Sequence, residues 1–155
     1  PLNGQDMMTP NTTPRIQKFT NFNQIHLAQK VIYKLSNNIQ FDFGLHYSTT
    51  SDYPRYDRLS TFDNDGVLKY AEWSYGPQDW FLANILMTKF SDSSRWFDKL
   101  KISSAYQNFK ESREDRDFQS PFREVRAESV DAISFNLDLE KELIESKEIR
   151  ELEYD

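Results

Sequence analysis

The clearest pattern in the chain is a strict alternation of apolar and polar residues over positions 39–48. A repeat of two residues is typical of a β-strand with one apolar and one polar face. The apolar set and the polar or small set are Ile39, Phe41, Phe43, Leu45 and Tyr47 against Gln40, Asp42, Gly44, His46 and Ser48. The pattern therefore predicts a long two-faced strand, which opens into a loop rich in Tyr, Trp, Arg and Asp.

Similar alternation recurs in other segments. Residues 22–35 and 124–140 carry it with few interruptions, and residues 99–109 carry it more briefly. Residues 80–90 are apolar almost throughout, so a strand and a short buried helix are both open there. The bend at 36–38 is typical of a tight hairpin turn. Together these segments predict an all-β fold, an antiparallel up-and-down meander of about five long strands.

The connections between the predicted strands differ in length. Short turns are expected at 36–38 and 91–96, and long polar loops at 51–78 and 110–123, with the sharpest turn signal at 63–66. Long antiparallel strands with short turns at one end and long loops at the other are typical of a transmembrane β-barrel. A soluble up-and-down sheet or barrel, with its apolar face turned inward, is the alternative, because alternation does not tell inside from outside.

The sequence divides into three predicted regions. Residues 1–20, rich in Pro, Asn and Thr, are expected to form a loop or a disordered arm. Residues 21–143 form the β-barrel segment. Residues 144–155 form a tail, for which a sixth strand and a short helix both stay open, because its Glu, Lys and Leu content favours a helix.

Composition removes several classes of protein. The 155 residues include no Cys, which excludes a disulfide scaffold and thiolate sites. No apolar run reaches the 18 or so residues that a transmembrane helix needs. The formal net charge is −6 with interleaved signs, so there is no basic surface for nucleic acid. The aromatic fraction of 15% is high, as expected for a β protein with alternating faces or an outer-membrane barrel.

Several short motifs resemble the barrel of TonB-dependent outer-membrane receptors of the Bacteroidetes type. They are SDYPRYDRL at 51–59, YGPQ at 75–78, and YQ at 106–107 with ESR at 111–113 and Arg116. The resemblance covers most of residues 20–140. It implies a location in the bacterial outer membrane and energy-coupled uptake of a scarce nutrient of the haem, cobalamin or siderophore class.

The resemblance also implies partners. Such receptors hold an N-terminal plug inside a barrel of 22 strands, whereas this sequence shows no plug, no TonB-contacting box and no signal. Five or six strands do not close a membrane barrel, for which eight is about the minimum. The chain is therefore expected to be a fragment of a receptor, an incomplete gene product or one chain of a larger assembly. Its expected partners are the remainder of the barrel and plug, the TonB system through that plug, outer-membrane lipid and a small-molecule nutrient.

The candidate ligand-binding residues lie on the predicted strand ends and loops: His46, Tyr53, Arg55, Tyr56, Arg58, Trp73 and Tyr75. Arginine suits bidentate contact with carboxylate or phosphate, and tyrosine supplies rigid contact area. The alternative is that the charges at 52–58 pair with one another and fix the loop. Trp73 and Tyr75, with Trp80, suit stacking on a flat ligand or an aromatic belt at the membrane interface.

Catalysis and metal binding find little support in the sequence. His26 and His46 lie on the polar face. His46 has two interpretations: an axial ligand of haem iron, or a solvated residue of the barrel lumen. Acidic residues at 111–117 lack the spacing of an EF-hand loop, and no nucleophile elbow surrounds Ser48 or Ser51. We expect no enzyme, no metal ion and no cofactor. A soluble β-sheet ligand-binding protein and a structural or interaction module are the alternative functions.

Overall fold

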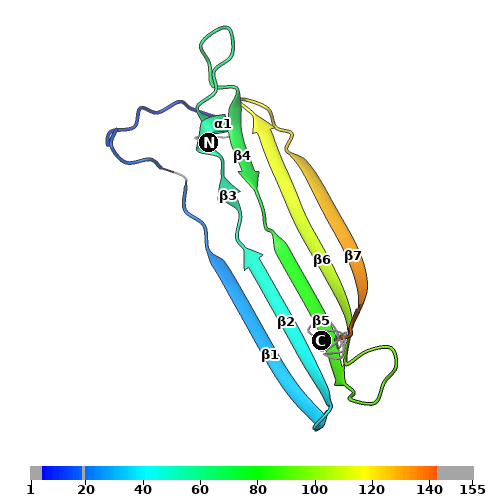
Figure 1. The fold of residues 1–155 in the computed structure, drawn as a ribbon. Coiled ribbons are helices and arrows are strands. Elements are labelled where there is room, and N and C mark those ends of the chain that lie inside the picture. The colour runs from blue at the N-terminus through cyan, green and yellow to red at the C-terminus, as the bar shows by residue number, and fades with distance from the viewer. Residues whose placement is uncertain (1–4, 19, 143–155) are drawn as a thin grey trace, which may run out of the picture.

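A computed structural model describes residues 5–18 and 20–142, which form one layer of antiparallel strands (Figure 1). No helix in these residues is long and apolar enough to cross a membrane. The elements are β1 (Gln24–Ser36), β2 (Ile39–Thr50), β3 (Tyr53–Pro54), α1 (Tyr56–Leu59), β4 (Tyr70–Tyr75), β5 (Asp79–Phe90), β6 (Lys99–Asp117) and β7 (Glu124–Glu140).

The sheet is a meander of five long lines of strand. β2 is followed along the sheet by β3, and β4 by β5, so β4 and β5 pair with successive parts of the same edge of β6. β7 pairs with the opposite edge of β6, and β1 pairs with β2. Figure 1 shows α1 and the hairpin after it at one end of the sheet and the β5–β6 loop at the other. The predicted all-β antiparallel meander is confirmed.

The predicted loop at 110–123 is wrong over most of its length. β6 continues to Asp117, and only residues 118–123 connect it to β7. The sequence indicated a loop because apolar alternation stops there. The strand nevertheless continues, because its main chain pairs with β4 on one edge and with β7 on the other. Its charged side chains find partners on neighbouring strands, as Arg116 does with Glu72 at 3.1 Å.

The structure also decides the secondary structure of two other segments. Residues 80–90 belong to a strand and not to a helix. The predicted loop at 51–78 contains the short strands β3 and β4 and the single helical turn α1. The predicted tail at 144–155, with its choice of strand or helix, lies outside the described residues.

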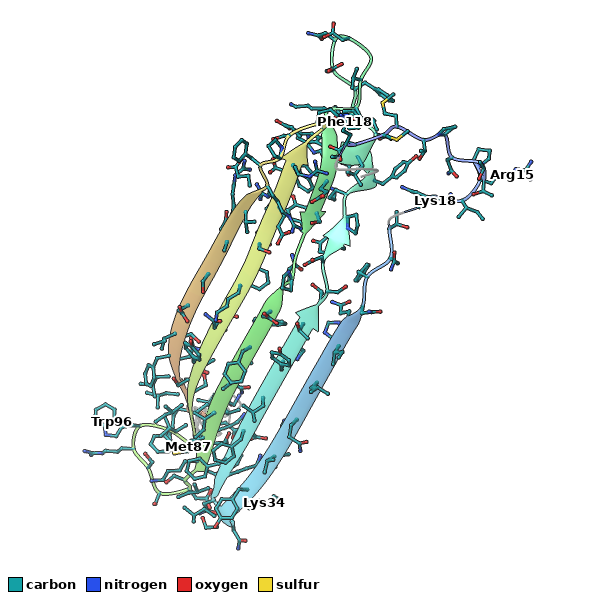
Figure 2. The ribbon with its side chains drawn as sticks, turned by 180° about the vertical axis from the view of Figure 1, so that it is seen from behind. Arg15, Lys18, Lys34, Met87, Trp96 and Phe118 are labelled. Atoms are coloured by element: carbon teal, nitrogen blue, oxygen red, sulfur yellow. The ribbon has the colours of Figure 1, made fainter. Side chains whose placement is uncertain are left out.

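The strand register places most apolar side chains of the five lines on one face. One row across the sheet is Tyr33, Phe41, Met87, Ile102 and Leu137. In Figure 2, Met87 and Lys34 lie at the same end of the sheet as Trp96 of the β5–β6 loop. This face is exposed: its large apolar side chains with at least 38% of their surface accessible are Ile25, Leu27, Val31, Tyr33, Leu35, Phe43, Leu45, Tyr47, Phe81, Ile85, Tyr106, Val125, Ile133, Phe135, Leu137 and Leu139.

Along β2 the polar face is the more sheltered one, whereas β1 and nearly all of β7 are exposed on both faces. The buried polar residues of the described chain, Asp42, Ser48, Thr50 and Thr88, lie on the polar face, whereas the only buried hydrophobic residue among the described ones is Trp73. A globular protein of this size normally buries its apolar residues and exposes its polar ones. Here the usual distribution is inverted, and the described residues form no packed apolar core.

Both outer strands are open along their length. Within the described residues β1 pairs only with β2, and β7 pairs only with β6. An open edge presents unpaired N–H and C=O groups that are satisfied by water or by a further strand. β1 and β7 also run in the same direction, because four antiparallel pairings separate them.

A substitution of Gly76, between β4 and β5, tests whether stability requires the close approach of this residue to the end of β2. We expect Gly76→Ala to lower the free energy of unfolding by about 2–3 kcal/mol. Its φ is +116°, and a Cβ there would lie 2.8 Å from Asp52 Cα and 2.9 Å from the Ser51 carbonyl oxygen. Urea unfolding in detergent micelles, followed by tryptophan fluorescence, measures the loss.

Gly66→Ala is the matched control. Gly66 also has a positive φ, +76°, but nothing lies within 4 Å of its added Cβ. The loss there should be about 1 kcal/mol, from backbone conformation alone. Equal losses for the two substitutions would contradict the steric role of Gly76.

Candidate functional site

An aromatic–arginine cluster lies at the end of the sheet that carries α1. It consists of Tyr53, Arg55, Trp73, Tyr75 and Arg113. One register row sets its centre, because Tyr53 of β3 pairs with Tyr75 of β4, which pairs with Arg113 of β6. Alternation along β4 places Trp73 on the same face as Tyr75, and Arg55 N donates to the Trp73 carbonyl at 3.0 Å.

The rings and guanidinium groups of this cluster are stacked. The rings of Trp73 and Tyr75 meet edge to face with centroids 5.0 Å apart, and those of Tyr53 and Tyr75 lie 5.5 Å apart. The guanidinium carbons of Arg55 and Arg113 each lie 5.3 Å from the Tyr75 centroid. Arginine over an aromatic face is attracted by the ring quadrupole. These contacts explain why Trp73 is buried in a sheet that has no core.

The cluster brings guanidinium groups and carboxylates together, with Glu111 near Tyr53 and Asp115 opposite Trp73. Arg55 forms a bidentate pair with Asp57 at 2.7 and 2.8 Å, which lowers the pKa of Asp57 below its usual value. Arg58 adds a third guanidinium group, 5.8 Å from the Trp73 centroid. The Nε of Arg113 is buried and has no hydrogen-bond partner among the described residues. Such an arrangement suits an anionic group beside a flat surface.

A polar bridge joins the cluster to β6. Gln78 Nε2 donates to Tyr53 Oη at 3.3 Å and to Glu111 Oε2 at 3.2 Å. Burial, with Tyr75 and Glu111 nearby, raises the pKa of the Tyr53 phenol. A phenol at its ordinary pKa is already protonated at neutral pH, so the O–H of Tyr53 is available as a donor.

The structure brings most of the predicted site residues together. Tyr53, Arg55, Arg58, Trp73 and Tyr75 share the cluster. The exceptions are Tyr56, which is 44% exposed on α1, and His46, which lies farther along β2 with its ring 4.6 Å from the Trp80 ring. The expected pairing of charges in the loop is present between Arg55 and Asp57.

The register also decides where the tryptophans lie. Trp73 opposes Asp115, and Trp80 opposes Ser48 on β2 and Phe109 on β6. All these positions belong to the polar face, so Trp73, Tyr75 and Trp80 do not project from the apolar face where a membrane-interface belt would lie. Arg113 was not among the predicted ligand-binding residues, because only the β4–β6 register shows that it meets Tyr75.

The N-terminal arm is fixed to the same end of the molecule by Asp6. Arg116 Nη1 and Nη2 donate to the two carboxylate oxygens of Asp6 at 2.7 and 2.9 Å. Gln119 adds its backbone N–H to the carboxylate at 2.8 Å and its side-chain amide to the Asp6 carbonyl at 2.7 Å. The Arg116 contact, together with Gln119, lowers the pKa of Asp6 to about 2.

Metal ligands are sparse: residues 5–18 and 20–142 contain no cluster of three or more His, Cys, Asp or Glu side chains suited to hold an ion. Comparisons with protein-family models, curated proteins and solved structures find no match. Membership of the receptor family therefore stays a prediction that rests on the motifs.

The Asp6 contact predicts a pH dependence at the β6–β7 loop. Because the folded pKa is depressed, the contact adds stability above the ordinary value near 3.8, and this is lost as pH falls through about 2. The amide proton of Gln119 should titrate with a midpoint near pH 2, measured by NMR. The Asp6→Asn variant should show no such titration. A midpoint near the ordinary value would show that the arm is not fixed in solution.

Proposed function

We propose that this chain forms part of the wall of an outer-membrane receptor of the TonB-dependent kind, with the aromatic–arginine cluster at the external mouth. The observation that carries the proposal is the inverted sheet, whose apolar face is open while the buried polar residues of the described chain all lie on the opposite face. In a membrane barrel the apolar face meets lipid and the polar face lines an aqueous interior.

The magnitude of the exposed apolar surface favours this environment. Removing one large apolar side chain from water contributes roughly 1.5–3 kcal/mol when burial is complete. The apolar face carries more than ten such side chains with 38–81% of their surface exposed. In water this face would oppose solubility by more than about 10 kcal/mol, whereas an acyl layer would remove the penalty. A soluble sheet is the less favourable alternative.

The height of the apolar band also fits a bilayer. It runs from Ile25 to Leu35 on β1 and from Ile39 to Tyr47 on β2, which is close to the roughly 9–11 residues of a tilted membrane strand. At its border Tyr47 Oη donates to Asp79 at 3.3 Å. Tyrosines whose rings meet the apolar region and whose hydroxyls reach polar groups are typical of a membrane interface.

The open edges support the expected partner, the remainder of a barrel. β1 and β7 run in the same direction, so a ring of strictly antiparallel strands containing these five lines needs an odd number of further strands between β7 and β1. Every edge must be paired in the acyl layer, because no water is present there to satisfy the backbone.

The ends of the sheet differ in the way an outer-membrane receptor requires. Beyond the apolar band, β3, β4 and the distal part of β6 carry the stacked arginines and aromatic rings. The opposite end has the turn between Ser36 and Ile39 and the β5–β6 loop. We assign the cluster end to the cell exterior and the turn end to the periplasm. The guanidinium groups and aromatic rings of the cluster suit a nutrient that carries an anionic group beside a flat ring system, and the family implies import through a plug coupled to TonB.

Nitroxide labels on matched cysteines test the lipid-facing assignment, since the chain has no Cys of its own. With the chain in outer-membrane vesicles of the bacterium that makes it, where the remainder of the barrel is present, a label at Phe135→Cys should be relaxed by oxygen and protected from a water-soluble nickel chelate. The neighbouring Ser134→Cys, on the opposite face, should show the reverse. Access of the nickel chelate to both positions would place the apolar face in water and contradict the proposal.

Labelling of the intact bacterium tests the orientation. Asn64→Cys, in the exposed hairpin beyond α1, should react with a membrane-impermeant maleimide. Ser93→Cys, in the exposed β5–β6 loop, should react only after the outer membrane is permeabilised. A gel shift measures the fraction of each variant that is labelled before and after permeabilisation. Labelling of Ser93→Cys alone would reverse the orientation, and equal labelling of both would contradict a membrane-spanning wall.

A further inference from the structure

We propose that His26 and His46 form a two-imidazole site for a divalent transition-metal ion of the Cu²⁺, Ni²⁺ or Zn²⁺ class on the polar face of the sheet. The chain has only two histidines. They lie on neighbouring strands, on the same face, with ring centroids 6.4 Å apart. No ion pair engages either ring among the described contacts.

The register explains why the two rings meet. His26 of β1 opposes Ser48, and His46 of β2 opposes Ala28. The two histidines are therefore diagonal neighbours, offset by two residues across an antiparallel pair. Diagonal side chains on one face are within reach of each other when they are long or aromatic.

The distance is suited to chelation after a small side-chain rotation. A metal–nitrogen bond is about 2.0–2.1 Å, which places two imidazole centroids about 5 Å apart on a tetrahedral ion. Rotation about the side-chain bonds closes the difference from 6.4 Å without moving the paired strands. Water fills the remaining coordination positions.

The surroundings restrain one of the two rings in the absence of an ion. The His46 ring packs against Trp80 at 4.6 Å, and Ser48, between His26 and Trp80 in the register, is only 9% exposed. The side chain of His46 is thus partly ordered before metal binds. Imidazole donors suit Cu²⁺, Ni²⁺ and Zn²⁺, while oxygen-preferring Mg²⁺ and Ca²⁺ are poorly matched.

The site depends on β1, β2 and β5 and not on what covers the apolar face. It is therefore independent of the proposed receptor function. If that function holds, the two imidazoles face the aqueous interior of the barrel, on the path of a ligand that enters from the cluster end.

The test is a titration of the full chain in detergent micelles with Cu²⁺ alone at neutral pH. We expect one ion per chain, two imidazole nitrogens in its electron paramagnetic resonance spectrum, and quenching of Trp80 fluorescence through His46. His26→Gln and His46→Gln should each weaken binding at least about 10-fold, because each removes half of a chelate. Gln107→Ala, on the same face but two strands away from His46 in the register, is the control and should leave the affinity unchanged.

Two further measurements make the outcome decisive. An excess of Zn²⁺ or Ni²⁺ should compete with Cu²⁺ for the site, and Mg²⁺ at the same concentration should not. Far-UV circular dichroism confirms that each variant keeps its strands. A single coordinated nitrogen, a less than 2-fold effect of either histidine substitution, or unchanged Cu²⁺ binding in the double variant would overturn the proposal.

Discussion

Everything else in this molecule depends on one constraint: a broad apolar sheet face has no partner within the described chain. The backbone is well satisfied, because the long antiparallel pairings connect β1 through to β7. The apolar side chains, in contrast, are poorly buried: Trp73 is the only buried hydrophobic residue of the described part. Burial of apolar surface is the main force that favours folding. The described residues therefore do not bury their apolar surface against one another, and both outer strands keep an open edge.

The end of the sheet beyond the apolar band is held together by other forces. Stacking of Arg55 and Arg113 on Tyr75 and the bidentate contact of Arg116 with Asp6 replace a core there. Exposed ion pairs are individually weak, but bidentate arginine geometry and aromatic stacking restrict orientation. A surface of this kind holds its side chains in place and still presents charge to a ligand.

The candidate site and the histidine pair share a physical origin. Each gathers side chains from strands that are distant in sequence or separated by a turn but adjacent in register: Tyr53, Tyr75 and Arg113 in one row, and His26 with His46 on one diagonal. Chemistry on a meander is assembled across strands and not along them. Local sequence spacing therefore carries little information about which residues cooperate.

The sequence by itself determined the strands and their faces, because a period of two is a local property of the backbone: the segment 39–48 and all of β7 were predicted closely. It did not determine the charged half of β6, where pairing on both edges overrides the loss of alternation. It identified Tyr53, Arg55, Trp73 and Tyr75 as candidates but not Arg113, whose role depends on register. Only the tertiary structure decided which face is open, since alternation is identical for a sheet that packs inward and one that faces outward.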